Sequence, residues 1–147
     1  MALKIGSKAP DFELEGTGGK KLRFYRDIDQ VCILYFYPKD FTPGCISEAC
    51  SFRDDFDFFK DLGIPVYGIS RDNLETHRNF IEKYKLPYEL LSDKDGKVSK
   101  LYKSLFPVIK MNKRVTYLVD RDKKIIGVFD NLFKAEQHVE EMRKALK

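Results

Sequence analysis

Apolar and polar positions follow one another along this chain in blocks that predict strands and helices in turn. Residues 31–37 are all apolar or aromatic, which is typical of a buried strand, and residues 65–70 form a second such run. Between them, polar and apolar residues at helical spacing predict one helix over 43–62. The remaining predicted elements are helices over 72–84 (capped by Asp72 or Asn73) and 134–146, a short helix starting over 98–101, and strands over 88–91, 115–119 and 125–129.

The N-terminal part predicts a β-hairpin. Two short alternating segments, 12–14 and 22–24, flank the glycine-rich residues 16–20. The last two predicted strands, joined by a polar turn, form a second antiparallel pair. Strands that alternate with helices, without repeats or linkers, predict an α/β three-layer sandwich in a single domain over 1–147.

Composition narrows the class of protein. The chain has 147 residues, 43% of them hydrophobic and 34% charged, with a formal net charge of +4. Basic and acidic residues are interspersed, so no nucleic-acid partner is expected. No apolar run approaches the roughly 18 residues that a membrane span needs, and the first residues lack the apolar stretch of a secretory signal. We therefore expect a globular cytoplasmic protein with no membrane partner.

The segment with the most chemical content is Thr42-Pro43-Gly44-Cys45, directly after the predicted strand over 31–37. Thr42 is a good N-cap and Pro43 suits the first helical position, which places Cys45 in the first turn. Free backbone N–H groups and the helix dipole favour a thiolate there, and the thiolate is the reactive form of cysteine. The plainer alternative is a pair of small buried cysteines.

Cys50 follows five residues after Cys45. Five residues of intact helix rise about 7.5 Å and turn about 500°, so the two side chains point roughly 140° apart. A disulfide between them therefore requires the first turn to unwind, at the poor helix former Gly44. Cys32 lies inside the predicted strand and is expected to be a core residue. No metal site is expected, because there is no Cys-x-x-Cys motif and the histidines are far away in sequence.

Four segments carry a resemblance to a known family. They are the Pro-x-x-x-Thr-x-x-Cys motif of Pro38, Thr42 and Cys45, the surrounding Thr-Pro-Gly-Cys-x-x-Glu-Ala-Cys, residues 114–120 (Arg-Val-Thr-Tyr-Leu-Val-Asp) and residues 6–12. In this order they resemble the peroxiredoxins, and closely the bacterioferritin-comigratory or PrxQ branch. The resemblance covers most of the chain and implies a thioredoxin-like fold with a mixed central sheet.

The resemblance also implies roles for individual residues. It implies that Cys45 is the peroxidatic cysteine and Cys50 the resolving one, joined in an intramolecular disulfide during the cycle. Thr42 and Arg114 would complete the peroxide site, and Pro38 would shield it. The implied activity is the reduction of hydrogen peroxide and organic hydroperoxides through a sulfenic acid on Cys45.

Lys113 and Glu48 are two further charged residues with alternative interpretations. Lys113, beside Arg114, is an alternative cation. Glu48 lies three residues after Cys45 and can relay a proton, pair with Arg114, or be a solvated helix carboxylate. No cofactor is required. The reductant is expected to be thioredoxin, glutaredoxin or a similar dithiol protein, acting on a monomer or weak dimer.

Three rival functions remain open at this point. A thioredoxin-type thiol–disulfide oxidoreductase without peroxidase activity is the nearest, although its usual Cys-x-x-Cys is absent. A cysteine hydrolase would need His77 or His138 as a base near Cys45. A chaperone-like or binding module would need an exposed apolar patch, for which Phe56, Phe58 and Phe59 are available.

Overall fold

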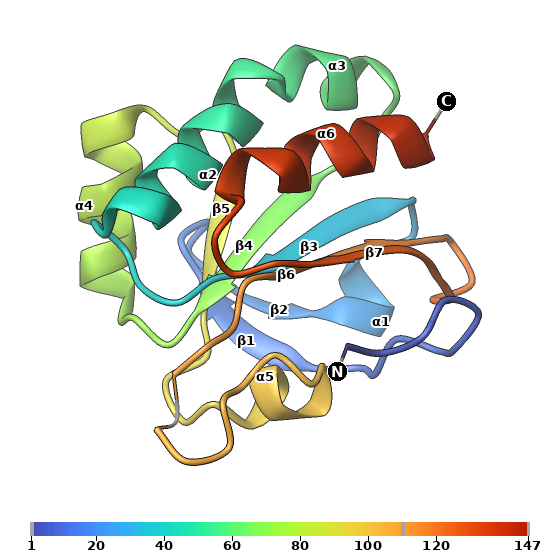
Figure 1. The fold of residues 1–147 in the computed structure, drawn as a ribbon, viewed down its shortest axis with the longest axis horizontal. Coiled ribbons are helices and arrows are strands. Elements are labelled where there is room, and N and C mark those ends of the chain that lie inside the picture. The colour runs from blue at the N-terminus through green and yellow to red at the C-terminus, as the bar shows by residue number, and fades with distance from the viewer. Residues whose placement is uncertain (1, 110, 147) are drawn as a thin grey trace.

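A computed structural model describes residues 2–109 and 111–146 of the chain. Its strands are β1 (Glu13–Gly16), β2 (Lys21–Arg23), β3 (Cys32–Phe36), β4 (Val66–Ser70), β5 (Glu89–Ser92), β6 (Val115–Val119) and β7 (Ile125–Asp130). Its helices are α1 (Phe24–Asp27), α2 (Pro43–Asp54), α3 (Phe56–Asp61), α4 (Leu74–Tyr84), α5 (Lys97–Leu101) and α6 (Ala135–Ala145). Figure 1 shows how these elements follow one another along the chain.

The seven strands form one mixed sheet in the order β2-β1-β5-β4-β3-β6-β7. Strands β3, β4 and β5 are parallel, whereas β6 pairs with β3 and β7 in antiparallel fashion. The N-terminal hairpin of β1 and β2 adds to the sheet through an antiparallel contact with β5. The predicted hairpins and mixed sheet are therefore confirmed.

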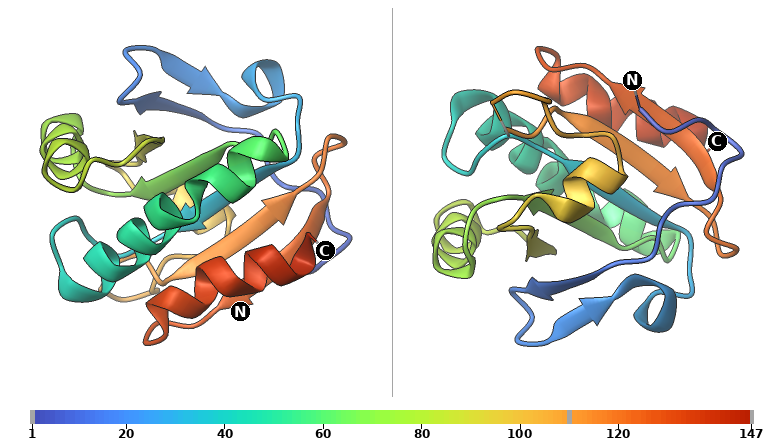
Figure 2. Two further views of the ribbon diagram at one scale, coloured as in Figure 1. Left: turned by 90° about the horizontal axis from the view of Figure 1, so that it is seen from above. Right: turned by 90° about the horizontal axis from the view of Figure 1, so that it is seen from below.

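Side chains of β3 supply both halves of the core, because successive residues of a strand point to opposite faces. Ile33 and Tyr35 pack in one cluster with residues of α2, α3, α4 and α6. Leu34 and Phe36 pack in the other, with residues of α1, α5 and the N-terminal segment. Figure 2 shows the sheet between these two groups of helices. This is the predicted three-layer α/β/α sandwich, and the burial of all five β3 residues explains its unbroken apolar run.

The single helix predicted over 43–62 is wrong, because the chain turns at Asp55 and continues as α3. Asp55 leaves helical geometry, with φ −98° and ψ 9°. The break lets three aromatic residues pack that one straight helix could not bury together. Phe56 lies against Tyr88, Phe59 against Phe52, and Phe58 against Phe59, with ring centroids 6.3, 6.1 and 5.3 Å apart.

Two smaller differences concern element ends. The second hairpin strand stops at Arg23, and Phe24 begins the four-residue helix α1, which the pattern did not indicate. Of the two candidate caps for α4, Asn73 is the one used, since its side chain accepts a hydrogen bond of 2.8 Å from the backbone of Thr76.

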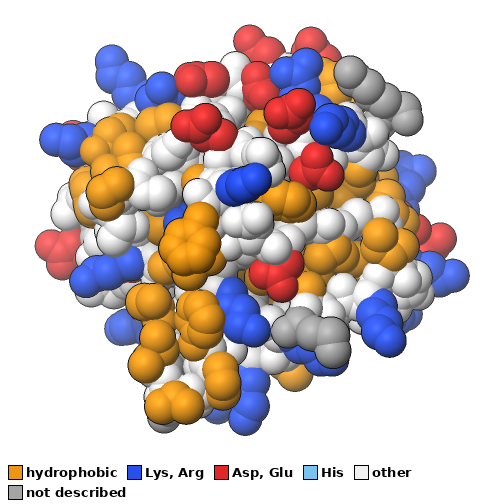
Figure 3. All heavy atoms as spheres, in the orientation of Figure 1, with side chains coloured by type: hydrophobic (Ala, Val, Ile, Leu, Met, Phe, Trp, Pro, Cys, Tyr) orange, Lys and Arg blue, Asp and Glu red, His pale blue; other side chains and the backbone are white. Residues whose placement is uncertain are grey.

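The aromatic residues of α3 do not form the exposed patch that a binding module would need. Phe59 is buried, and Phe56 and Phe58 are partly buried against the core. Val108, Ile109 and Met111 are exposed in the segment between α5 and β6, and apolar atoms gather there at the lower left of Figure 3. Within the described residues, every helix is too short or too polar to cross a bilayer.

Candidate active site

The site is built where β3 ends and the chain turns into α2. Thr42 precedes the helix in extended geometry (φ −86°, ψ 148°), Pro43 is its first residue, and the Ile46 N–H donates to the Thr42 carbonyl at 2.8 Å. Cys45 therefore lies in the first turn, as expected. The Thr42 side chain does not cap the helix, because its hydroxyl donates to the Lys39 carbonyl at 2.7 Å. Its oxygen lone pairs remain able to accept a hydrogen bond from a substrate O–H.

Arg114 is the cation that the fold brings to Cys45. In the antiparallel register of β3 and β6, Phe36 is opposite Val115, so the preceding residue Arg114 lies beside the start of the loop to α2. The Arg114 Nη2 group donates to Cys45 Sγ at 3.5 Å. Lys113, the alternative cation, instead lies over the Phe106 ring, with Nζ 5.7 Å from its centroid.

Two further hydrogen bonds, both donated by Arg114, hold its side chain in place. Its Nη1 donates to Glu48 Oε1 at 2.6 Å, and its Nε donates to the Leu132 carbonyl at 3.0 Å. With only 4% of the residue exposed, the planar guanidinium is fixed on three sides. Such a fixed, water-shielded cation stabilises negative charge on sulfur or oxygen more strongly than a mobile surface lysine does.

Gly44 makes room for this guanidinium. A Cβ atom at Gly44 would lie 2.8 Å from Arg114 Nη2, closer than a carbon and a nitrogen approach without displacement. The sequence singled out Gly44 as a weak point of the helix, and the structure adds that it permits the close approach of the cation. Gly44 and Cys45 also present the free backbone N–H groups of a helix start.

The protonation of Cys45 differs from the simple helix-start expectation. Burial raises the pKa of the Cys45 thiol, since only 1% of the residue is exposed. The Arg114 guanidinium opposes this rise. The expected thiolate preference is thus outweighed by burial, which the sequence pattern did not include.

Glu48 faces the same arginine from the next turn of α2. It is fully buried, so the solvated-carboxylate alternative is wrong. Burial raises the pKa of Glu48 to about 8, despite the opposing effect of Arg114. Its Oε2 atom finds no hydrogen-bond partner among the described residues. Burial thus favours the protonated form of Glu48, while its Oε1 atom accepts the hydrogen bond from Arg114.

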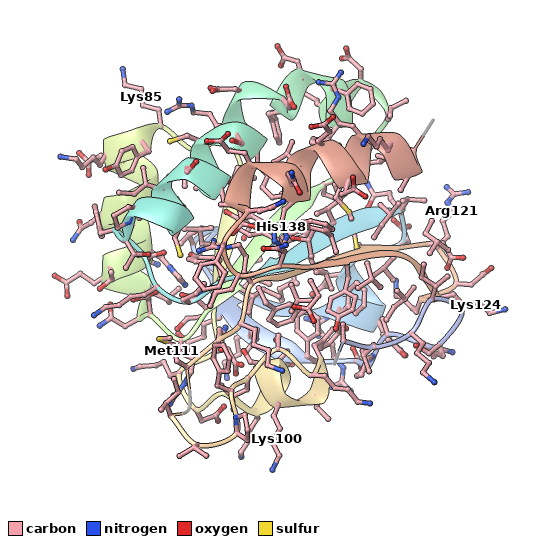
Figure 4. The ribbon with its side chains drawn as sticks, viewed as in Figure 1. Lys85, Lys100, Met111, Arg121, Lys124 and His138 are labelled. Carbon is pink, nitrogen blue, oxygen red and sulfur yellow. The ribbon has the colours of Figure 1, made fainter. Side chains whose placement is uncertain are left out.

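His138, named in the sequence only as a candidate base of a hydrolase, lies beside Glu48, which the sequence pattern did not indicate. Its Nδ1 lies 3.5 Å from Glu48 Oε2 and 2.7 Å from Thr116 Oγ1, while its Nε2 donates to the Asn131 carbonyl at 2.8 Å. Burial lowers the pKa of His138 to about 4, so the ring is neutral. Figure 4 shows it between α6 and the sheet. Its place on the apolar face of α6, one residue before Val139, was the available signal.

Neither histidine is placed as a base for Cys45. The ring nitrogens of His138 are engaged as above, and those of His77 lie against Asp40 Oδ2 at 2.6 Å and the Leu91 carbonyl at 3.0 Å. The cysteine hydrolase alternative therefore lacks its histidine.

The remaining predicted residues lie nearby or in the core. Cys50 is half-buried on α2, and burial raises the pKa of its thiol. Cys32 is fully buried in β3, as expected, where burial raises its thiol pKa to about 12. Pro38 is half-buried in the loop between β3 and α2. All three cysteines are free, and α2 runs unbroken through both Cys45 and Cys50.

One group of described side chains has ligand atoms close enough together for a metal ion. Atoms of Asp40, Asp72 and His77 lie within 4.8 Å of one another. They are already hydrogen-bonded: Asp40 Oδ2 to His77, and Asp72 Oδ2 to the Asp40 backbone and the Ser70 hydroxyl. This arrangement is that of a closed polar network and not of an open coordination site.

Comparison with known proteins identifies the family. The sequence profile of the AhpC/TSA family matches residues 5–128. Peroxiredoxin Bcp of Bacillus subtilis is 38% identical and covers 100% of this chain and 97% of its own length. Chloroplastic peroxiredoxin Q of Arabidopsis thaliana is 41% identical over 97% of this chain, which spans 66% of that longer protein.

Solved structures agree with these relatives. Peroxidoxin BcpB of Mycobacterium tuberculosis superimposes with a TM-score of 0.90 at 32% identity, over 98% of this chain and 96% of its own. A peroxiredoxin Q variant from Xanthomonas campestris, at 24% identity and a TM-score of 0.82, shares the fold and covers 92% of each chain. The chain therefore belongs to the AhpC/TSA family, in the branch of peroxiredoxin Q and Bcp, whose members are thiol-dependent peroxidases.

Proposed function

We propose that this protein reduces hydroperoxides through Cys45 as the peroxidatic cysteine and Cys50 as the resolving cysteine. The observation that carries the proposal is the contact of 3.5 Å between Arg114 Nη2 and Cys45 Sγ in the first turn of α2. Family membership favours this activity over that of a thioredoxin-type oxidoreductase without peroxidase activity.

The first step is attack of the Cys45 thiolate on the terminal oxygen of the hydroperoxide. An S–O bond forms, the O–O bond breaks, and the alkoxide or hydroxide that leaves takes up the proton released by the thiol. Arg114 stabilises the thiolate and then the negative charge on the leaving oxygen. The Thr42 oxygen accepts from the peroxide O–H, and the backbone N–H groups of the helix start bind the substrate oxygens.

The second step joins the two cysteines. The Cys50 thiol attacks the sulfenic sulfur of Cys45, a disulfide forms, and water leaves. On the intact helix the two side chains diverge, so this step requires the first turn of α2 to unwind. An external dithiol protein of the thioredoxin or glutaredoxin kind then returns both thiols by exchange, beginning at the more exposed sulfur.

Other parts of the proposal follow from the same chemistry. Hydrogen peroxide and organic hydroperoxides are the substrates, Pro38 shields the thiol, and no cofactor takes part. The relatives include both bacterial and chloroplastic proteins, so the compartment varies within the branch. A cytoplasmic monomer or weak dimer is our expectation for this chain.

The test is a single turnover without added reductant. Reduced protein is mixed with one equivalent of hydrogen peroxide, and intact mass and peptide mapping follow. We expect full consumption, a loss of two hydrogens, and a peptide pair joined by Cys45 and Cys50. Cys50→Ser should instead stop at a sulfenic acid on Cys45 that dimedone traps. Cys32→Ser, the matched control in the core, should behave as the unmodified protein does. Peroxide consumption by Cys45→Ser at the unmodified rate would refute the proposal.

A further inference from the structure

A buried polar cluster lies outside the peroxide site, where the loop between β3 and α2 packs against α4. It consists of Tyr37, Asp40 and His77, of which Asp40 is 2% and His77 0% exposed. The Tyr37 hydroxyl donates to Asp40 Oδ1 at 2.6 Å, and Asp40 Oδ2 lies 2.6 Å from His77 Nδ1. Nothing in the peroxide chemistry described above uses these groups.

The contacts of His77 fix where its protons must be. Its Nε2 lies 3.0 Å from the Leu91 carbonyl, and a carbonyl can only accept, so Nε2 carries a proton. Its Nδ1 lies 2.6 Å from a carboxylate oxygen, a distance that two acceptors without a proton between them do not keep. Asp40 and His77 therefore share one further proton, as an imidazolium and carboxylate or their neutral equivalent.

This pair ties the loop to two separate elements. Asp40 belongs to the segment between β3 and α2, whereas His77 is on α4 and its other partner, Leu91, is in β5. The backbone N–H of Asp40 adds a bond of 2.8 Å to Asp72 Oδ2. The upstream end of the loop is thus held from its side chain and from its backbone.

The residue after Asp40 is strained. Phe41 has φ of +66°, a left-handed conformation that costs energy for any residue with a Cβ. Its ring packs on Phe80 of α4, with centroids 5.1 Å apart, yet the residue is 40% exposed. A strained residue between an anchored aspartate and a helix start persists only while the anchor holds.

We propose that Asp40 and His77, through their shared proton, are a positioning pair for the peroxide site. The closed pair holds Thr42 and the first turn of α2 in the geometry that peroxide attack needs. The hydrogen bond between Asp40 and His77 breaks when that turn unwinds and lets Cys45 reach Cys50. The second half of this inference rests on the proposed Cys45–Cys50 disulfide.

Chain connectivity links the breaking of the Asp40–His77 hydrogen bond to the unwinding of the first turn of α2. Four residues separate Asp40 from Cys45. An unwound first turn moves Cys45 toward Cys50 and pulls on this short segment, whose other end is Asp40. Release of Asp40 also lets Phe41 leave its left-handed conformation, so parting of the pair and unwinding of the helix favour one another.

Two substitutions at His77 separate its two hydrogen bonds. The amide nitrogen of asparagine lies where Nδ1 does, so His77→Asn keeps the bond to Asp40 and loses the bond to Leu91. The amide nitrogen of glutamine reaches the position of Nε2, so His77→Gln keeps Leu91 and leaves the Asp40 carboxylate without its partner. Both replace the buried ring by an uncharged amide, which makes them a matched pair.

The experiment measures the two chemical steps separately by quenched flow and mass spectrometry. We expect His77→Gln to form the sulfenic acid at least tenfold more slowly, while conversion of that acid to the disulfide is as fast as in the unmodified protein or faster. We expect His77→Asn to stay within about threefold for both steps. Equal effects of the two variants on sulfenic acid formation would overturn the inference, since a merely structural histidine gives no such split.

A measurement on the unmodified protein keeps the inference testable even if a variant fails to fold. The imidazole resonances of His77 are recorded by ¹⁵N NMR in the reduced and the disulfide forms. We expect them to change on oxidation, because the shared proton loses its partner, and unchanged His77 resonances would refute the parting of the pair. If oxidised protein contains no Cys45–Cys50 disulfide, the proposed function fails first, independently of His77.

Discussion

The buried carboxyl of Glu48 offers the sharpest test of the electrostatics of this site. The substitution is Glu48→Gln, which keeps the size of the side chain and an oxygen that accepts from Arg114. Burial raises the pKa of Glu48 from 4.5 to about 8. The folded protein therefore binds a proton that the unfolded chain has lost, and the stability that depends on this proton falls as pH rises from 4.5 through 8.

The magnitude follows from the shift in pKa. A shift of one pH unit corresponds to about 1.4 kcal/mol, so raising 4.5 to about 8 gives a ceiling of about 5 kcal/mol. Below pH 4.5 the group is protonated in both states and its contribution is fully present. His138, whose pKa is lowered to about 4, contributes in the opposite direction in both proteins, so the comparison between them isolates Glu48. We expect the free energy of unfolding of the unmodified protein, relative to that of Glu48→Gln at the same pH, to decrease by a few kcal/mol between pH 5 and 8.

The assay is urea denaturation followed by circular dichroism at pH 5, 6, 7 and 8, with all cysteines kept reduced. The control is Glu82→Gln, which makes the same chemical change on the exposed face of α4. The control should keep the pH slope of the unmodified protein. If Glu48→Gln keeps that slope as well, Glu48 is a permanently charged partner of Arg114 and the reasoning is refuted.

Three other outcomes are expected. Gly44→Ala should slow sulfenic acid formation at least tenfold, because the new Cβ displaces Arg114 Nη2, and quenched flow would measure this rate. Arg114→Lys should slow the same step by about 10²–10³-fold while the fold persists, because a single ammonium cannot replace the guanidinium fork. Iodoacetamide at pH 8 should alkylate Cys50 before Cys45 and leave Cys32 unmodified until the protein unfolds, as peptide mass mapping would show.

A different result would contradict each of these three predictions. An unchanged rate in Gly44→Ala would mean that Arg114 can retreat without loss. An unchanged rate in Arg114→Lys would leave the backbone N–H groups as the main stabilisers of charge. Early alkylation of Cys32 would contradict its burial in β3, where burial raises the pKa of its thiol to about 12.

The fold and the central residues of the site could be predicted from the sequence because local patterns indicate them. The run over 31–37 has the composition of a strand buried on both faces, and Thr42-Pro43 marks a helix start that puts Cys45 in its first turn. Arg114 was predicted from a motif. Its contact with Cys45 depends on the pairing of β6 with β3, which no local pattern determines.

The sequence pattern did not show which side chains of the site are buried. Burial raises the pKa of the Cys45 thiol, against the preference for a thiolate that the helix start predicts. Burial also raises the pKa of Glu48, and His138 packs beside this carboxyl group. The break at Asp55 has the same origin, since it depends on where Phe56 and Phe59 find partners. Tertiary packing determines both the burial of these residues and the helix break, and the spacing of residues along one helix does not show how the helices pack.

The pairing of β6 with β3 also sets when the site becomes reactive. All three cysteines are synthesised before residue 51, and Arg114 enters the chain only in its last third. A nascent or truncated chain can therefore possess the thiols but lack the cation. We therefore expect fast reaction with peroxide only after β6 has docked on β3, so its onset during refolding would report the pairing of these two strands.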